Sequence, residues 1–540
     1  MPQVVTSRHS KPSPKPAGIQ RQLYFMPIIV GLLAFAGSAT IGLIGGIAEP
    51  SVHDEFSYLL AADTFAHGRL TNPTHPLWIH FESIHIIHQP TYMSKYPPGQ
   101  GAMLALGQLL TGYPIVGVWM SMGLMCAAIC WMLQAWVPPR WAVIGGLFSV
   151  LHPYMGIGGY WAQSYWGGAL AATGGALVLG GIRSLLKEPQ IHRALLLGVG
   201  LAMLANSRPY EGLLVGVCAA LVLLTKLSRK PTIKTSVLAR KVIFPLVMAC
   251  ISIGAWIGYY NFRVTGDIFR LPYQVHEAAY SVAPLFVWQE PPTTPKYRHA
   301  RLAEFHTVYA LSRYTEKRSW IGFANANLNA WLMYVYFAGN IFVFPLIANF
   351  RALSRWILRN PWGRIAFIIY SVVTLGLLIE TYLLLHYWAP VVALNYYFYV
   401  QAIRLWMRRN RRLKRFIVPL TFCLLVTLLI IATELRIMGE EKPLGARYQR
   451  TSLLAHLEQQ PGKHVVLVQY GPEQSVHREW VYNKADMDQA KVVWARDMGQ
   501  RENCKLVEYF KNHVVWSLAI EGDDAPVKVT PFPRQSCGAY

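Results

Sequence analysis

Two adjacent carboxylates, Asp54 and Glu55, follow directly after the first long apolar segment of the chain. Residues 22–48 carry no charge, and a membrane-spanning helix needs roughly 20 such residues. A positioned carboxylate can act as a general base that takes a proton from an acceptor hydroxyl. A carboxylate here can also cap the helix predicted by the apolar stripe of residues 55–67. Two acids exceed what capping requires, so we expect a catalytic base in this pair.

A second cluster is Lys95-Tyr96-Pro97-Pro98-Gly99. The prolines predict an extended loop that starts the next helix, because Pro fits the first helical position. Lys95 either extends its apolar stem along the membrane surface or places its ammonium group on an anionic lipid headgroup. The spacing leaves both interpretations open.

Two further clusters are Arg208-Pro209-Tyr210-Glu211-Gly212 and His386-Tyr387-Trp388. Arg208 and Glu211 are three residues apart, and side chains at this spacing meet on a helix. They either form a structural ion pair, or Arg208 binds a phosphate through its planar guanidinium group.

Four histidines crowd the first outer loop, ahead of Lys95: His75, His80, His85 and His88. A metal site needs converging ligands, and this segment contains no cysteine and no compact ligand motif. We therefore assign no metal ligands, although a divalent metal cofactor stays possible. Together with the nearby aromatic residues, these histidines predict a loop that rests on the membrane interface.

Composition defines the setting of these clusters. Of the 540 residues, 53% are hydrophobic and 14% charged, whereas soluble proteins carry about 25% charged residues. The net charge of +23 comes from short basic loops between apolar blocks, as cytoplasmic loops of membrane proteins show. This pattern argues against nucleic-acid binding and predicts an all-α polytopic membrane protein surrounded by lipid.

The basic loops also predict the topology. Residues 1–21 are expected to form a disordered cytoplasmic N-terminus, and residues 22–438 a membrane domain of about eleven spans. Basic segments 183–193, 226–241, 351–364 and 404–415 are then cytoplasmic, and all the clusters above fall on the outer face. Most predicted span centres lack ionisable groups, whereas a transporter or lipid flippase, the alternative function, would place them near the midplane.

Residues 439–540 contain no long apolar block and predict a small extracytoplasmic α/β domain. Apolar runs suggest strands at 464–471, 491–496, 514–520 and 527–530, with a helix at 502–511. No nucleotide-binding fingerprint is present, so we assign this region no catalysis. Cys504 and Cys537 either pair in an oxidising compartment or remain free.

The acidic pair after the first span, the interfacial helix and the Lys-Tyr-Pro-Pro-Gly segment resemble the GT-C membrane glycosyltransferases. The likeness is to the branch of protein O-mannosyltransferases and lipid A aminoarabinose transferases, including bacterial glycosyltransferase family 39-like proteins. It is strongest over residues 20–260, and the C-terminal region departs from both groups.

The resemblance implies transfer of a sugar, with inversion, from a polyprenyl-phosphate carrier to a glycan, lipid or protein acceptor outside the membrane. A multi-pass protein of the bacterial inner membrane, facing the periplasm or exterior, would suit this reaction. Asp54 matches the proposed base, with Glu55 as its neighbour, and Lys95 matches a residue near the carrier phosphate. Tyr96, Arg208, Glu211 and His386 are expected to line the same substrate site.

Overall fold

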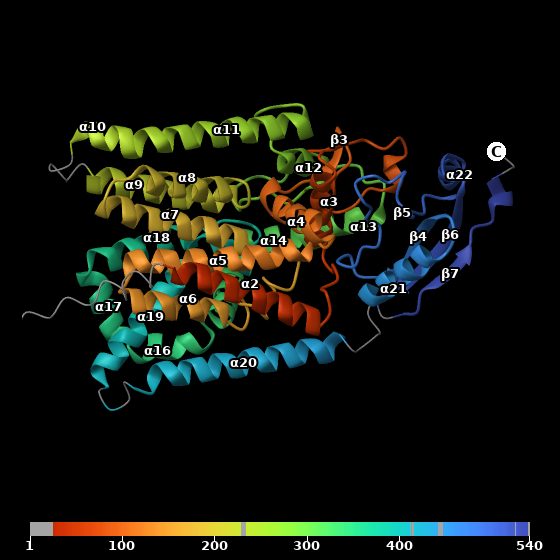
Figure 1. Ribbon diagram of the computed structural model, residues 1–540. Helices are drawn as coiled ribbons and strands as arrows, with labels where there is room; N and C mark the ends of the chain where they lie inside the picture. The colour runs from red at the N-terminus through yellow and green to blue at the C-terminus, as the bar shows by residue number, and fades with distance from the viewer. Residues whose placement is uncertain are drawn as a thin grey trace, which may run out of the picture.

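The computed structural model describes residues 25–227, 234–410, 412, 415–440, 446–523 and 525–537. The predicted N-terminal segment 1–21 lies outside these residues, as do parts of the basic segments 226–241 and 404–415. A long helical bundle carries a small sheet at one end (Figure 1). The bundle comprises α2 (Met26–Ile44), α5 (Ile115–Trp136), α6 (Pro139–Val150), α7 (Ala169–Lys187), α8 (Ile191–Ala205), α9 (Pro209–Leu227), α10 (Thr235–Leu238), α11 (Phe244–Thr265), α15 (Trp320–Tyr334), α16 (Val343–Ala348), α17 (Phe350–Arg359), α18 (Pro361–Leu378), α19 (Val392–Arg409) and α20 (Ile417–Glu440).

Eight helical segments of the described chain are long and apolar enough to cross a membrane. Two of them are composite, Thr235–Thr265 and Trp320–Ala348. The shorter or more polar helices α6, α8 and α19 pack between the long ones. The described residues therefore contain eight segments of spanning length and composition, against about eleven expected spans.

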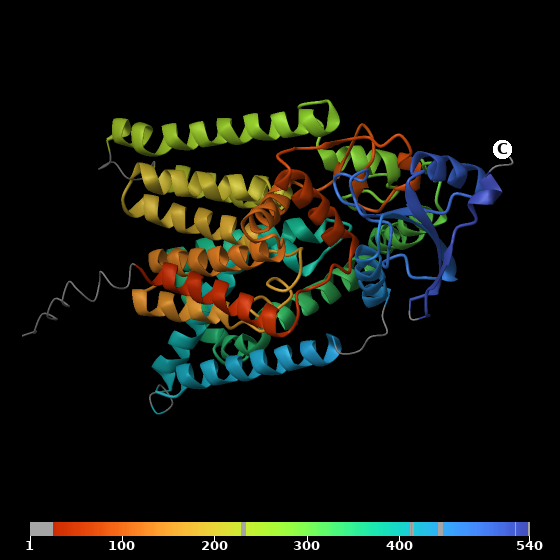
Figure 2. The same ribbon diagram turned by 45° about the vertical axis from the view of Figure 1, so that its right-hand side comes forward.

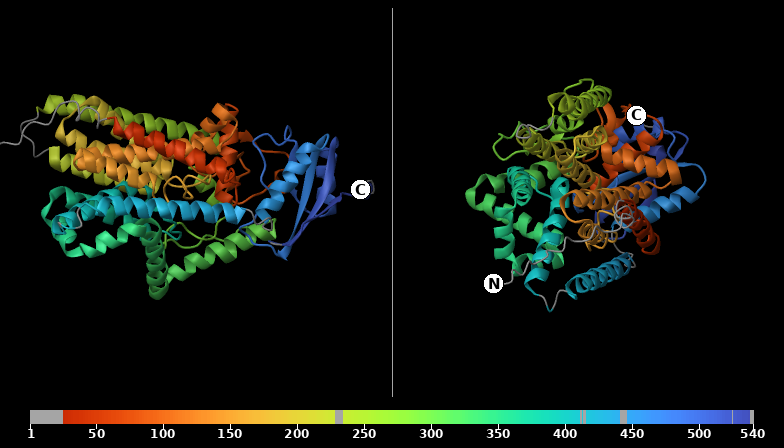
Figure 3. Two further views of the ribbon diagram at one scale, coloured as in Figure 1. Left: turned by 60° about the horizontal axis from the view of Figure 1, so that its bottom comes forward. Right: turned by 60° about the vertical axis from the view of Figure 1, so that its left-hand side comes forward.

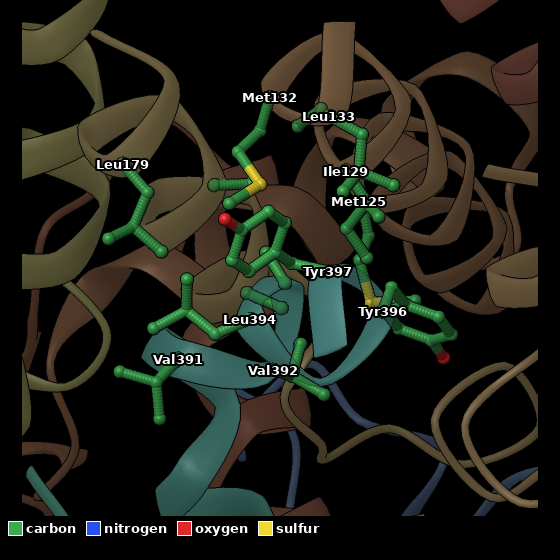
Figure 4. Packing of buried hydrophobic residues seen from close by; sticks show 14 of the residues in the cluster. Met125, Ile129, Met132, Leu133, Leu179, Val391, Val392, Leu394, Tyr396 and Tyr397 are labelled. Carbon is green, nitrogen blue, oxygen red and sulfur yellow. The ribbon is translucent and has the colours of Figure 1, made fainter. Parts of the chain in front are cut away.

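The bundle core lies where α5, α7 and α19 meet. Figure 4 shows Met125, Met132 and Leu133 of α5 facing Leu394 and Tyr397 of α19. Small residues let the elements approach closely: a Cβ atom on Gly175 of α7 would collide with the carbonyl oxygen of Pro390. This approach fixes the 3₁₀ segment η6 (Leu385–Val391), which carries His386, against α7.

Short elements fill the end of the bundle nearest the sheet (Figure 1). They are α3 (His53–Ala66), β1 (Asn72–Pro73), β2 (Ile86–Ile87), β3 (Thr91–Ser94), α4 (Pro98–Thr111), α12 (Pro272–Tyr280), α13 (Ala300–Glu304) and α14 (Leu311–Arg318). The break between α4 and α5 falls at Gly112, whose φ of +83° suits glycine. The helix predicted over residues 55–67 is confirmed as α3.

The C-terminal sheet has the order β5-β4-β6-β7, with β4 parallel to β5 and β6, and β7 antiparallel to β6. Its elements are α21 (Ala446–Gln459), β4 (Lys463–Glu473), β5 (Val492–Arg496), α22 (Gln500–Tyr509), β6 (His513–Gly522) and β7 (Lys528–Pro531). All four predicted strands and the predicted helix are confirmed. Cys504 and Cys537 form a disulfide, which decides between the two alternatives.

The sheet covers the histidine-containing segment, as Figure 2 and the left view of Figure 3 show. Arg496 Nε donates to the carbonyl oxygen of Glu82 at 2.7 Å, and the Tyr92 hydroxyl donates to that of Asn483 at 3.0 Å. His80 is fully buried beside the Arg496 carbonyl. The expectation that this loop rests on the membrane interface is therefore wrong. Its apolar residues Phe81, Ile86 and Tyr92 pack instead against Val465 and Leu467 of β4.

Candidate active site

The two acids at the start of α3 have different surroundings. Glu55 is buried, and its Oε2 accepts hydrogen bonds from the Ser51 and Val52 amides at 2.7 and 3.2 Å. Its Oε1 accepts from the Tyr165 amide at 3.0 Å. The amide of Val52, the residue before α3, has no acceptor within the helix, and the Glu55 side chain three residues later accepts its hydrogen bond. Capping is therefore the work of Glu55, not of Asp54.

Asp54 is half-buried on the same helical turn and faces an aromatic group. The Tyr96 hydroxyl donates a 2.5 Å hydrogen bond to Asp54 Oδ1. The Tyr96 ring stacks on Tyr58 with 4.7 Å between centroids, which fixes the direction of the hydroxyl. Asp54 is thus a carboxylate that a neighbouring side chain orients.

Lys95 has an acidic partner that the sequence did not reveal. Its Nζ lies 3.2 Å from Glu277 Oε1 on α12 and 4.8 Å from the Tyr273 ring centroid. Burial alone would raise the pKa of Glu277, but Lys95 and His276 hold that pKa well below its usual range. Glu277 lies about 180 residues beyond Lys95 in a long polar stretch, and no motif marks it. Lys95 is therefore a paired cation.

Arg208 precedes α9 and has only a loose carboxylate partner. Its Nη1 lies 3.7 Å from Glu211 Oε1, and its guanidinium lies 4.5 Å from the Tyr387 ring centroid. His386 is buried, with its ring 4.9 Å from that of Trp166. Burial, and then the charge of Arg208, lowers the pKa of His386 well below its usual value. His386 is consequently neutral beside a permanent cation.

These groups form one polar cluster at the end of the bundle beneath the sheet. Burial raises the pKa of Tyr58, while Arg208 lowers it and Asp54 raises it. The same two charges act on the pKa of Tyr387, in the same directions. Asp54 and Arg208 therefore lie within electrostatic reach of shared hydroxyl groups, although 154 positions separate them in the chain.

The edge of this cluster contains the carboxyl group of Glu380, which follows the end of α18. Burial, and then the charge of Glu211, raises the pKa of Glu380 to about 9. Lys317 Nζ donates to the Glu380 carbonyl oxygen at 2.7 Å. Glu380 thus holds its proton more tightly than a carboxyl group in water does.

Buried histidines lie next to Lys95 without forming a ligand set. His85, His276 and His306 each have a buried ring nitrogen without a hydrogen-bond partner in the described chain. However, no group of three or more His, Cys, Asp or Glu side chains in the described residues could hold a metal ion.

Comparison with known proteins supports the architecture. No family model and no curated protein matches the chain. An oligosaccharyltransferase of Archaeoglobus fulgidus, solved with a tethered acceptor peptide, matches 92% of this chain and 69% of its own, with a TM-score of 0.50 and 10% identity. Its complex with zinc and sulfate matches 91% and 67%, with a TM-score of 0.50 and 11% identity.

The fold is that of the GT-C membrane glycosyltransferases. ArnT from Cupriavidus metallidurans covers 93% of both chains at 13% identity, with a TM-score of 0.49. At such identities the GT-C likeness establishes the fold, and the chemistry must be argued from the side chains.

Proposed function

We propose that this protein transfers a sugar from a polyprenyl-phosphate carrier to an acceptor hydroxyl at the membrane surface, with Asp54 as the general base. The observation that carries the proposal is the cluster of Asp54, Tyr96, Tyr387 and Arg208. An oriented carboxylate and a loosely paired guanidinium here share one polar site in a GT-C fold.

Asp54 and Arg208 have different roles in the proposed reaction. The acceptor oxygen attacks the anomeric carbon and loses its proton to Asp54, while the bond from that carbon to the carrier phosphate breaks with inversion. The leaving phosphate retains the bonding electrons, and fixed positive groups stabilise such developing charge. Arg208 is the better placed cation, because Lys95 already pairs with Glu277 at 3.2 Å. Lys95 then lines the outer side of the phosphate site.

Two observations support a site on the extracytoplasmic side. The cluster lies at the end of the bundle that carries the Cys504–Cys537 disulfide, and disulfides persist in oxidising compartments. The basic segments at 351–359 and 404–409 lie at the opposite end (Figure 1). This arrangement fits the positive-inside rule and an inner membrane whose active site faces outward.

The test is release of polyprenyl phosphate by the purified full-length protein from synthetic polyprenyl-phosphate hexoses and aminopentoses. Asp54→Asn keeps the shape of the side chain but removes the base, so the rate with the best donor should fall about 10²- to 10⁴-fold. Asp267→Asn, on an exposed loop at the same end, is the matched control and should retain the full rate.

The outcomes separate the proposal from its alternatives. A folded Asp54→Asn variant with an undiminished rate would exclude Asp54 as the base. Movement of the carrier lipid across a vesicle membrane, without cleavage of any donor by the wild type, would support a flippase instead.

A further inference from the structure

A cavity of about 220 Å³ lies at the end of the bundle opposite the Asp54 cluster. It opens between the C-terminal ends of α5, α7 and α19 and the junction of α17 with α18, the end labelled by α17 and α19 in Figure 1. Its lining contains three arginines, Arg183, Arg404 and Arg408, and no carboxylate. We call it the arginine cavity.

The arginines have no counter-charge in the described chain, since no ion pair with a carboxylate joins them there. Arg404 donates to the Gln401 amide oxygen at 3.0 Å, a neutral partner. Arg183 has a buried Nε without a hydrogen-bond partner among the described residues. Like charges gathered around one space repel one another, and an anion in that space relieves the repulsion.

Aromatic rings hold Arg183 in place. The central carbon of the Arg183 guanidinium lies over the Trp362 ring, 3.9 Å from its centroid. Trp136 contacts Trp362 edge-on at 5.4 Å and Tyr397 at 5.1 Å. Stacking on a ring leaves the in-plane N–H groups of a guanidinium free to bind oxygen atoms in pairs. The arrangement thus presents fixed donors to a planar or tetrahedral oxyanion.

We propose that the arginine cavity binds a phosphate group, carried by an anionic lipid or free in solution. Its volume is below the roughly 300–1,000 Å³ of sites that enclose a whole drug-sized ligand, so it suits a headgroup. Basic pockets between transmembrane helices at a membrane surface bind lipid phosphates, and the tryptophans are typical of the membrane interface. The site is separate from the Asp54 cluster, and its occupancy does not depend on the function proposed above.

The test compares the full-length protein in nanodiscs of pure phosphatidylcholine with nanodiscs that contain phosphatidylglycerol, measured by thermal unfolding and by native mass spectrometry of retained lipid. A ligand that binds the folded state raises Tm. We expect a rise of several degrees with phosphatidylglycerol, and at least tenfold weaker lipid retention in R404Q/R408Q. The charge-matched control R351Q/R359Q changes two exposed arginines of α17 outside the cavity and should behave as wild type.

A second arm adds inorganic phosphate to the phosphatidylcholine nanodiscs, with chloride at equal ionic strength as the comparison for screening. A rise in Tm with phosphate, lost in R404Q/R408Q, would support the site and identify a soluble phosphate as its source. Equal effects of both double variants, or no response of the wild type to either phosphate source, would overturn the proposal. Arg183→Gln tests the half-buried arginine, and the lipid retained by this variant should also fall at least tenfold.

Discussion

The Tyr96 hydroxyl donates a 2.5 Å hydrogen bond to Asp54 Oδ1. Tyr96 follows Lys95 in the loop before α4, and Asp54 lies in the first turn of α3. The bond joins two of the clusters that the sequence singles out, and it aims the carboxylate across a gap of 42 residues. The orientation of the Asp54 carboxylate therefore depends on the Tyr96 hydroxyl.

Tyr96→Phe should leave the stacked ring in place and remove only the donor to Asp54. We expect kcat for sugar transfer to fall about tenfold or more, because a hydrogen bond to a charged group contributes roughly 1.5–3 kcal/mol. KM for the donor should change little. Steady-state kinetics checks this split, and a variant that raises KM alone would instead place Tyr96 in donor binding.

Glu55→Gln should act on stability. The replacement turns an amide N–H₂ group toward backbone donors that now meet a carboxylate. We expect a loss of about 1–3 kcal/mol, measured as a lower unfolding midpoint in detergent, with nearly wild-type kcat for the protein that remains folded. A stable but inactive Glu55→Gln variant would show that Glu55 takes part in the chemistry.

Lys95→Met should break the pair with Glu277 and destabilise the protein by roughly 3 kcal/mol at pH 7, the lower end of the range for buried pairs. The folded-state pKa of Glu277 is depressed, so its contribution is present above the unfolded value of 4.5 and is lost as the pH falls. The difference in unfolding midpoint between wild type and variant should therefore narrow from pH 7 to pH 3. The double variant with Glu277→Gln should recover part of the loss.

The surroundings of His53, at the junction with the C-terminal sheet, predict a second pH dependence of the stability. Its ring nitrogens lie 2.6 Å from the Tyr482 hydroxyl oxygen and 2.8 Å from the Val476 carbonyl oxygen. Burial lowers the pKa of His53 to about 4 from a usual 6.5. As the pH falls below 6.5, His53 therefore binds a proton in the unfolded chain before it does so in the folded protein. The free energy of unfolding is lower by about 3 kcal/mol at pH 4 as a result.

His53→Gln should flatten the fall of the unfolding midpoint between pH 6.5 and pH 4. The exposed His67, on the next turn beyond α3, provides the matched control: His67→Gln should leave the wild-type slope unchanged. An equal effect of both substitutions would assign the slope to general charge repulsion.

The helices and strands of this protein could largely be predicted from its sequence, because each is encoded by residues close together in the chain. A span, a strand or an interfacial helix is encoded by the period and length of its apolar residues, so the bundle, α3 and the strands β4 to β7 could be predicted. Asp54, Lys95, Arg208 and His386 could be singled out for a similar reason, because charged and polar groups are costly beside apolar helices.

The tertiary structure decided the hydrogen-bond and ion-pair partners of these residues. The hydrogen bond from the amide of Tyr165 to Glu55 depends on packing that brings together two residues 110 positions apart. The pairing of Lys95 with Glu277 and the burial of the histidines under the sheet depend on contacts of the same kind. The arginine cavity likewise gathers residues of α5, α7, α17, α18 and α19. Hydrogen bonds and ion pairs act over a few ångströms, so only the folded chain determines which side chains share them.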